Sequence, residues 1–169
     1  MMNDAMTDAL NGQVNAEIYS SYLYLSMSAY FENTSLPGFA NWMRVQAQEE
    51  LAHGMKIFDF INERGGRAEL RTVDAPPKAW ESPEAAFANV VEHELKVTSL
   101  INGLVDLAIE HRDHATNNFL QWFVGEQVEE EASANDTLQK VRRAGDGGGL
   151  YILDTELAAR IFTPPATKE

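Results

Sequence analysis

Helical periodicity in four long segments is the feature that most constrains the fold of this chain of 169 residues. The segments run roughly over residues 7–31, 38–64, 83–111 and 113–144. Helices of this length exceed the usual range in globular proteins and are typical of bundles. Patterns typical of strands are nearly absent, so we predict an all-α fold.

The connections between these segments indicate how they pack. A short turn joins the first two, and Ser35 is placed to cap the second helix, with Pro37 in its first turn. The second helix ends at Gly65-Gly66. The non-helical stretch 67–82 is long enough to run the full height of a bundle. We therefore predict an antiparallel four-helix bundle in which one long crossover joins two helical hairpins.

The length of the chain fits a single domain over residues 1–169. The bundle is expected to occupy about residues 7–144. After a glycine-rich break, the apolar segment at about 150–162 predicts a short fifth helix, and residues 163–169 form a polar tail.

Composition excludes several classes of protein. The chain has 26 acidic and 13 basic residues, a net charge of −13, which argues against binding nucleic acid or anionic membranes. The lack of cysteine excludes disulfides and thiolate metal sites. No apolar run is long enough to span a bilayer, and the chain does not begin with a signal-peptide pattern. We expect a cytoplasmic protein.

Polar residues of the kinds that bind metals interrupt an apolar stripe near the middle of each predicted helix. Residues seven apart lie on nearly the same face of a helix. The four stripes, with the residues beside them, are Leu10, Glu17, Tyr24, Phe31; Met43, Glu50, Ile57, with His53 and Phe60; Phe87, Glu94, Ile101, Ala108; and Leu120, Gln127, Ala134, with Phe123 and Glu130.

A bundle would bring these polar side chains into one layer. A single glutamate on an apolar stripe is usually partly solvated or half of an ion pair, but four would converge here, together with a histidine. Burying even one unpaired charge costs several kcal/mol, and no lysine or arginine lies next to them on the stripes. The remaining compensation is one or more bound cations. Carboxylates with one imidazole and no thiolate suit iron, manganese or zinc.

The spacing of the ligands narrows this prediction. Glu50-x-x-His53 places both side chains on one helix face, where a carboxylate can bridge two metals. Dimetal carboxylate bundles use one Glu from each of two helices and Glu-x-x-His from each of the others. Glu17 and Glu94 are the single glutamates, and the second motif here reads Gln127-x-x-Glu130.

Four motifs stand in the order and spacing of one known family. They are Ala16-Glu17-Ile18-Tyr19-Ser20, Gln48-Glu49-Glu50-Leu51-Ala52-His53, His93-Glu94, and Asn118-Phe119-Leu120-Gln121-Trp122-Phe123-Val124-Gly125-Glu126-Gln127. On these motifs the chain resembles the non-haem ferritins of bacteria and archaea, over roughly residues 10–157. The resemblance implies a bundle with a short fifth helix, assembled into a hollow homo-oligomeric shell of 24 subunits. It also implies a ferroxidase that oxidises Fe(II) with dioxygen and stores the product as a ferric oxyhydroxide mineral.

The resemblance implies a role for each ligand. Glu17, Glu50 and His53 would bind the first iron of a di-iron site. Glu50 would bridge to the second iron, which Glu94 and Glu130 would also bind.

Further roles follow from the same resemblance. Gln127 would hydrogen-bond near the iron pair, and Tyr24 matches the tyrosine of the family's site. Glu49, Glu126 and Glu129 match a third iron site, which shares one ligand with the second. An ordinary solvated position is an equally good interpretation for these three glutamates.

Departures from related families also carry information. Bacterioferritins have a haem-ligating Met where this chain has Leu51, and a histidine where it has Glu130, so we expect no haem. His93, His111 and His114 show no ligand spacing and are expected at the surface.

Two other functions remain open at this point. One is a di-iron or di-manganese enzyme acting on an organic substrate, which would need a pocket beside the metals; bulky Tyr24, Phe123 and Trp122 argue against such a pocket. The other is a non-catalytic helical oligomer whose buried carboxylates pair with other cations. The second alternative predicts no consumption of dioxygen with Fe(II).

Overall fold

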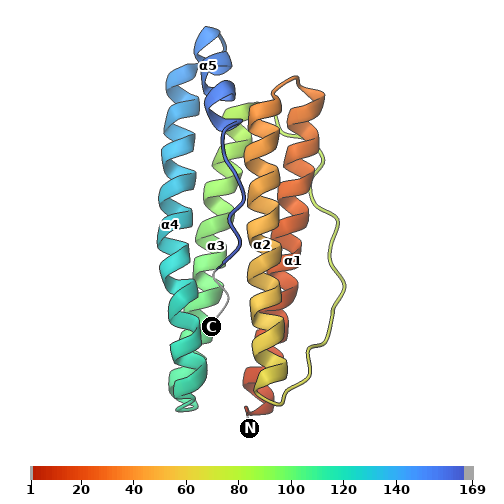
Figure 1. Cartoon of the computed structure of the whole chain (residues 1–169), viewed down its shortest axis with the longest axis vertical. Coiled ribbons are helices and arrows are strands. Elements are labelled where there is room, and N and C mark those ends of the chain that lie inside the picture. The colour runs from red at the N-terminus through yellow and green to blue at the C-terminus, as the bar shows by residue number, and fades with distance from the viewer. Residues whose placement is uncertain (1, 166–169) are drawn as a thin grey trace.

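The computed structural model describes residues 2–165 and confirms the all-α prediction, since no strand occurs in that range. None of the helices in the described part has both the length and the apolar character needed to cross a membrane. The helices are α1 (Asp4–Asn33), α2 (Pro37–Glu63), α3 (Pro83–Glu110), α4 (His114–Ala144) and α5 (Gly148–Leu157), as Figure 1 shows.

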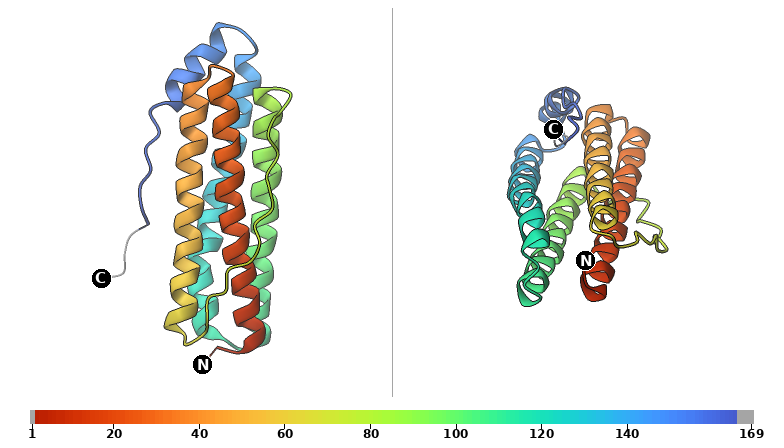
Figure 2. Two further views of the ribbon diagram at one scale, coloured as in Figure 1. Left: turned by 90° about the vertical axis from the view of Figure 1, so that its right-hand side faces the viewer. Right: turned by 60° about the horizontal axis from the view of Figure 1, so that its bottom comes forward.

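The four long helices pack as two antiparallel hairpins, α1 with α2 and α3 with α4. The crossover between α2 and α3 runs along the outside of the bundle beside α1 (Figures 1 and 2). At one end, the side chain of Asn11 donates to the carbonyl of Arg67 at 3.0 Å and accepts from the amide of Glu69 at 2.8 Å. Towards the other end, the hydroxyl of Ser26 donates to the carbonyl of Pro77. The crossover therefore spans the height of the bundle, as predicted.

Three of the long helices begin at a side-chain cap close in sequence. Asn3 accepts from the amide of Met6 at 2.7 Å, and Ser82 accepts from the amide of Ala85 at 3.0 Å. Asp113 caps α4 in the same way. Such caps satisfy amide groups that have no partner within the helix.

The second helix is capped by a residue far away in sequence, so the prediction for Ser35 was wrong. Ser35 adopts a positive φ of 60°, and the N-cap residue of α2 is Leu36, which makes no side-chain cap bond. Instead, Asp154 of α5 accepts from the amides of Gly38 at 2.8 Å and Phe39 at 3.0 Å. A Cβ atom at Gly38 would lie 1.7 Å from the carbonyl oxygen of Asp154, so only glycine fits.

The fifth helix ends at Leu157 rather than near Phe162. Asn41 of α2 donates to the carbonyls of Leu157, Ala158 and Arg160 at 3.2, 3.3 and 3.0 Å. These bonds satisfy carbonyl groups that a longer helix would have paired internally. Residues 158–165, here called the C-terminal segment, then extend back along the bundle (Figure 1). Residues 166–169 of the predicted tail lie outside the described part.

The apolar core forms two clusters, one towards each end of the bundle. One cluster contains Phe31, Phe39 and Phe87, whose ring centroids lie 5.1 to 6.3 Å apart. The other contains Leu10 and Ile57, both fully buried. Each long helix contributes to both clusters, so the middle of every helix lies between two close-packed regions. The polar side chains described next occupy that middle layer.

Candidate metal centre

A layer of buried polar side chains crosses the middle of the bundle, with at least one member from each long helix. Three of its glutamates are each only 1% exposed, which removes them from bulk water. The layer lies between the two apolar clusters because its members interrupt the apolar stripes that form those clusters. This polar layer consists of Glu17, Glu50, His53, Glu94, Gln127 and Glu130.

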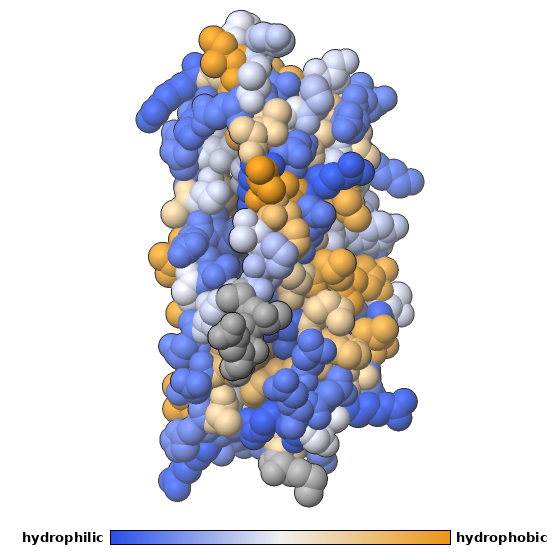
Figure 3. Space-filling view, in the orientation of Figure 1, coloured by the Kyte–Doolittle hydropathy of each residue, from blue (hydrophilic) through white to orange (hydrophobic). Residues whose placement is uncertain are grey.

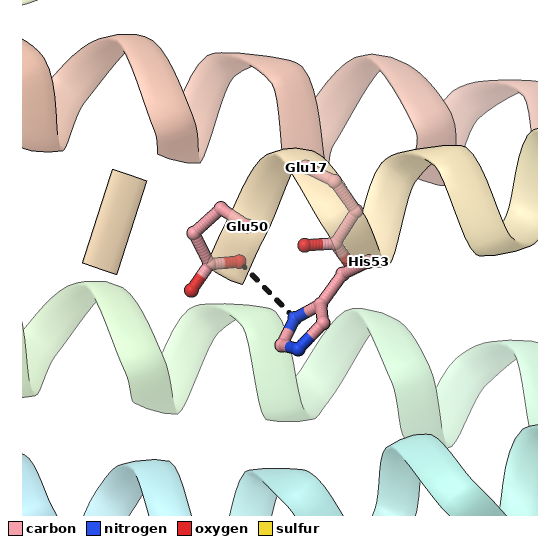
Figure 4. Close-up of side chains that lie close together, drawn as sticks. All are labelled: Glu17, Glu50 and His53. Atoms are coloured by element: carbon pink, nitrogen blue, oxygen red, sulfur yellow. Dashed lines mark ion pairs between the residues drawn. The ribbon is translucent and has the colours of Figure 1, made fainter. Parts of the chain in front are cut away.

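Glu17, Glu50 and His53 lie close together in the layer (Figure 4). Each offers one ligand atom, and these atoms lie within 4.8 Å of one another. Nδ1 of His53 is 3.5 Å from Oε2 of Glu50. Oε2 of Glu17 is buried without a hydrogen-bond partner. Leaving such an acceptor unsatisfied costs about 1–3 kcal/mol, and more if it is charged, so this oxygen suits a bound cation.

A second group shares His53 with the first. His53, Glu126 and Glu130 also offer ligand atoms within 4.8 Å of one another. Nε2 of His53 lies 3.9 Å from Oε2 of Glu126. The imidazole thus stands between two acidic groups, one near each ring nitrogen. The ring system of Trp122 packs almost perpendicular to it, with centroids 5.4 Å apart and an interplanar angle of 84°.

Glu94 is held on the other side of the layer by hydrogen bonds. The hydroxyl of Tyr24 donates to Oε1 of Glu94. The amide of Gln127 donates to Oε2 of Glu94 at 3.3 Å and to the hydroxyl of Thr98 at 3.2 Å. Glu94 belongs to neither of the two three-residue groups.

Two of the predicted ligands of the second iron, Glu50 and Glu130, are joined by a glutamine that sequence reasoning missed. The amide nitrogen of Gln46 donates to Glu130 at 2.7 Å and to Glu50 at 3.2 Å. Gln13 donates to Glu17 at 2.8 Å in the same manner. Each glutamine precedes its glutamate by four residues, which places both on one helix face. That spacing was visible in the sequence and could have identified both.

Burial and mutual repulsion raise the pKa values of three carboxyl groups of the layer. Burial, with a further contribution from Glu50, raises the pKa of Glu17 well above its usual value. Burial, followed by Glu94 and Glu130, does the same to the pKa of Glu50. Burial and then Glu130 raise the pKa of Glu94 to about 7. These three carboxyl groups therefore hold protons more strongly than exposed ones, and a bound metal cation would instead favour their ionised form.

The three glutamates that match a third iron site line one cavity in the structure. Glu49, Glu126 and Glu129 line a space of about 360 Å³ at the edge of the polar layer. Glu49 and Glu126 are partly buried, whereas Glu129 is exposed. Burial raises the pKa of both Glu49 and Glu126. The edge chamber, as this space is called below, is also lined by His53, Trp122, Glu130, Ser133, Arg160, Thr163 and Pro165.

His93 was expected at the surface, and that expectation was wrong. It is 9% exposed, and its Nε2 lies 2.8 Å from the hydroxyl of Ser20. The edge of one ring meets the face of the other between His93 and Tyr24, with centroids 5.9 Å apart. Burial, with a further contribution from Lys96, lowers the pKa of His93 to about 4. His111 and His114 are exposed, as expected.

Comparison with known proteins gives consistent matches. Residues 7–144 match the family model of the ferritin-like domain. The chain is 45% identical over 160 residues to a bacterial non-heme ferritin of Bacteroides fragilis (strain 638R), covering 95% of this chain and 100% of the relative. It is 42% identical over 163 residues to a bacterial non-heme ferritin of Staphylococcus saprophyticus, covering 96% and 98% of the two chains.

Solved structures match equally well. One is a closed form of the Archaeoglobus fulgidus ferritin engineered by site-directed mutagenesis, with a TM-score of 0.95 and 57% identity over 96% of this chain and 100% of that chain. Another is an open-pore ferritin from the same hyperthermophilic archaeon, with a TM-score of 0.94 and 56% identity over 95% and 100% of the two chains.

Proposed function

Because this chain belongs to the ferritin-like family, we propose that it is an iron-storage subunit that oxidises Fe(II) with dioxygen inside its helical bundle. One observation carries the proposal. Glu17 presents a buried oxygen without a hydrogen-bond partner, within a group of ligand atoms that includes Glu50 and His53. Hard carboxylate oxygens with one imidazole match the ligands that iron accepts.

Two iron positions are proposed within the polar layer. Glu17, Glu50 and His53 bind the first iron. Glu50 also bridges to the second iron, which Glu94 and Glu130 bind. The short distances within the first group, and the hydrogen bonds through which Gln46 links Glu50 to Glu130, support this assignment.

The carboxylates make oxidation of the bound iron favourable. They are hard anionic ligands, which stabilise Fe(III) more than Fe(II). Each Fe(II) gives one electron to dioxygen, which takes up protons as it is reduced. Tyr24 and Gln127 hold Glu94 in place through their hydrogen bonds. The ferric product then passes to storage as an oxyhydroxide mineral.

A third metal position is proposed in the edge chamber. Glu49, Glu126 and Glu129 would bind it together with Glu130, and the lining of the chamber supports this grouping. Because His53 belongs to both groups of ligand atoms, the chamber adjoins the first iron position. An ion in the chamber would therefore lie on a route between the polar layer and the outside.

We also propose that the subunits assemble into a hollow homo-oligomeric shell of 24 copies in the cytoplasm. The matched structures are ferritins described as open-pore or closed, which supports a shell. Several large apolar side chains of α1 and α2 are exposed, among them Tyr22, Leu25, Leu51 and Met55. Figure 3 shows apolar surface gathered over this part of one face. Such patches mark contacts between proteins. Leu51, in place of a haem-ligating Met, supports a shell without haem.

The two alternative functions are less well supported. A groove of about 710 Å³ is lined by Leu51, Met55 and Phe60 among others, but by no residue of the polar layer. An organic substrate held there would not reach the proposed irons. The edge chamber does adjoin the layer, but four of the residues that line it are glutamates, which suit cations better than an apolar organic substrate. A non-catalytic oligomer that binds other cations would also give the unpartnered oxygen of Glu17 a partner, but it predicts no dioxygen uptake with Fe(II), and the similarity to bacterial non-heme ferritins favours iron storage.

The test is to add Fe(II) to the metal-free protein in air and to measure dioxygen uptake, native mass and iron retained per chain. A large shell retaining far more iron than its ligands can hold is expected. Glu50→Ala should abolish the fast phase of oxidation, whereas Glu110→Ala, at an exposed position on α3, should not. Unchanged initial rates in a folded Glu50→Ala shell would refute the site. A small oligomer with two irons would favour the organic-substrate enzyme.

A further inference from the structure

Arg160 places a positive charge in the wall of the edge chamber. It extends from the C-terminal segment onto α2, and its side chain is 22% exposed. Nη2 donates to Oε2 of Glu49 at 2.6 Å and to Oε1 of Gln46 at 2.8 Å. Nη1 donates to the carbonyl of Trp42 at 3.3 Å, and the guanidinium lies 4.5 Å from the centroid of the Trp42 ring. The guanidinium thus has a defined binding position rather than a loose surface contact.

The backbone beneath Arg160 is held independently of its charge. Asn41 binds the carbonyl of Arg160 and those of the two residues that end α5. At the other end of α5, Asp154 caps α2. The charge is therefore tethered at the chamber by contacts that do not involve Glu49. Because these bonds already hold the backbone, and Gln46 and Trp42 hold the guanidinium, the pair with Glu49 costs less conformational entropy than an ordinary surface pair.

Arg160 and a metal ion in the chamber compete for the same carboxylate. Glu49 is one of the four glutamates that line the space, and its Oε2 is already bonded to the guanidinium. A divalent ion bound to that oxygen would also repel the neighbouring positive charge.

We propose that Arg160 is a positioning residue that serves as a tethered counter-cation of the edge chamber, so that a third metal ion must displace it from Glu49. This inference rests on the proposed function, because it assumes that metal ions reach the chamber and the adjoining layer. It predicts that Arg160 weakens metal binding in the chamber without removing the two positions in the polar layer.

The same contact connects the chamber with the polar layer. Because Arg160 donates to the amide oxygen of Gln46, the amide nitrogen must face the opposite way, towards Glu50 and Glu130. Displacement of Arg160 removes this constraint on Gln46. An ion in the chamber therefore alters the hydrogen bonds of two proposed iron ligands without touching Glu50.

The experiment titrates Zn²⁺ alone into the metal-free shell and follows binding by calorimetry. Wild type should bind two ions per chain tightly and a third more weakly. In Arg160→Gln the third ion should bind about tenfold more tightly, because the charge-assisted hydrogen bond to Glu49 no longer competes with the metal. Arg160→Lys should stay near wild type. Arg142→Gln is the matched control, because it also removes one positive charge, from an exposed pair with Glu84.

Each outcome decides the proposal. If the third Zn²⁺ binds with equal affinity to Arg160→Gln and to wild type, while both proteins still bind the two tight ions, the inference alone is overturned. If neither wild type nor any variant binds two Zn²⁺ ions tightly, the proposed function is overturned, and the inference with it. A second measurement uses the wild-type protein, so its result does not depend on whether a variant folds. Crystals soaked in Zn²⁺ should show the ion at Glu49 with the Arg160 contact broken, and zinc at Glu49 beside an intact contact would refute the displacement.

Discussion

The hydroxyl of Tyr24 donates a hydrogen bond to Glu94 across the polar layer, joining α1 to α3 in the dry centre of the bundle. Tyr24 is fully buried and Glu94 is 1% exposed, so water cannot replace this bond. The bonds from Tyr24 and Gln127 lower the pKa of Glu94, while burial and Glu130 raise it by more. Tyr24 therefore stabilises the charged form of Glu94 in the metal-free protein.

Tyr24→Phe should destabilise the metal-free protein in a pH-dependent manner. At pH 8, where Glu94 is ionised, loss of the donor should cost about 1–3 kcal/mol of unfolding free energy. At pH 5 the carboxyl group carries a proton, and the loss should be smaller. Denaturant unfolding at the two pH values measures both. Tyr22→Phe, at a half-exposed position, is the control. An equal loss at both pH values would assign the effect to packing.

The raised pKa of Glu94 predicts how stability changes with pH. An acid whose pKa is higher in the folded state binds more protons when folded, so stability falls as pH rises from about 4.5 to about 7. The shift corresponds to roughly 3 kcal/mol at most. Burial raises the pKa values of Glu17 and Glu50 as well, so they act in the same direction.

Glu94→Gln isolates this contribution. His93 acts with the opposite sign, because its pKa is lowered to about 4 and its contribution to stability is lost as pH falls below 6.5. The difference in unfolding free energy between metal-free wild type and Glu94→Gln should therefore change between pH 5 and 8, with the variant losing less stability. Parallel curves for the two proteins would show that Glu94 does not titrate in this window.

Helical periodicity was sufficient to predict the bundle and the polar side chains buried in its middle. A seven-residue step keeps Glu17 facing the same side as Leu10, so the apolar face of a helix also gives the direction of its polar interruptions. This reasoning does not depend on how the helices are connected. It therefore placed Glu17, Glu50 and Glu94 in one layer, and the structure has them there.

The residues that were missed depend on contacts that no local pattern encodes. Asp154 caps α2 through the amide of Gly38, 116 residues earlier in the chain, and Arg160 reaches Glu49 across 111 residues. Both contacts require knowledge of where α5 packs. His93 was assigned to the surface because it lacks ligand spacing, yet a buried histidine needs only one partner, which Ser20 provides. Gln46 could have been predicted, because its position four residues before Glu50 is visible in the sequence and places both side chains on one helix face.

Gly38 is where the contact between α2 and α5 is closest, and it allows a sharp test of that packing. A Cβ at residue 38 would lie 1.7 Å from the carbonyl oxygen of Asp154 and 2.9 Å from its Oδ1. Gly38→Ala should push α5 away and break the cap on α2, at a cost of about 3 kcal/mol. Gly103→Ala is the matched control, because nothing lies within 4 Å of its Cβ position in α3. It should stabilise the protein by about 0.5–1 kcal/mol.

Denaturant unfolding of the metal-free variants measures both effects. The Gly38→Ala variant should also mobilise the C-terminal segment, because α5 connects that segment to the bundle, and limited proteolysis near Arg160 would report this. Wild-type stability in Gly38→Ala would mean that α5 can shift without losing the cap. In that case the cap from Asp154 would survive the shift, and Asn41 would still hold the segment, since its three bonds to the end of α5 and to Arg160 do not pass through Gly38.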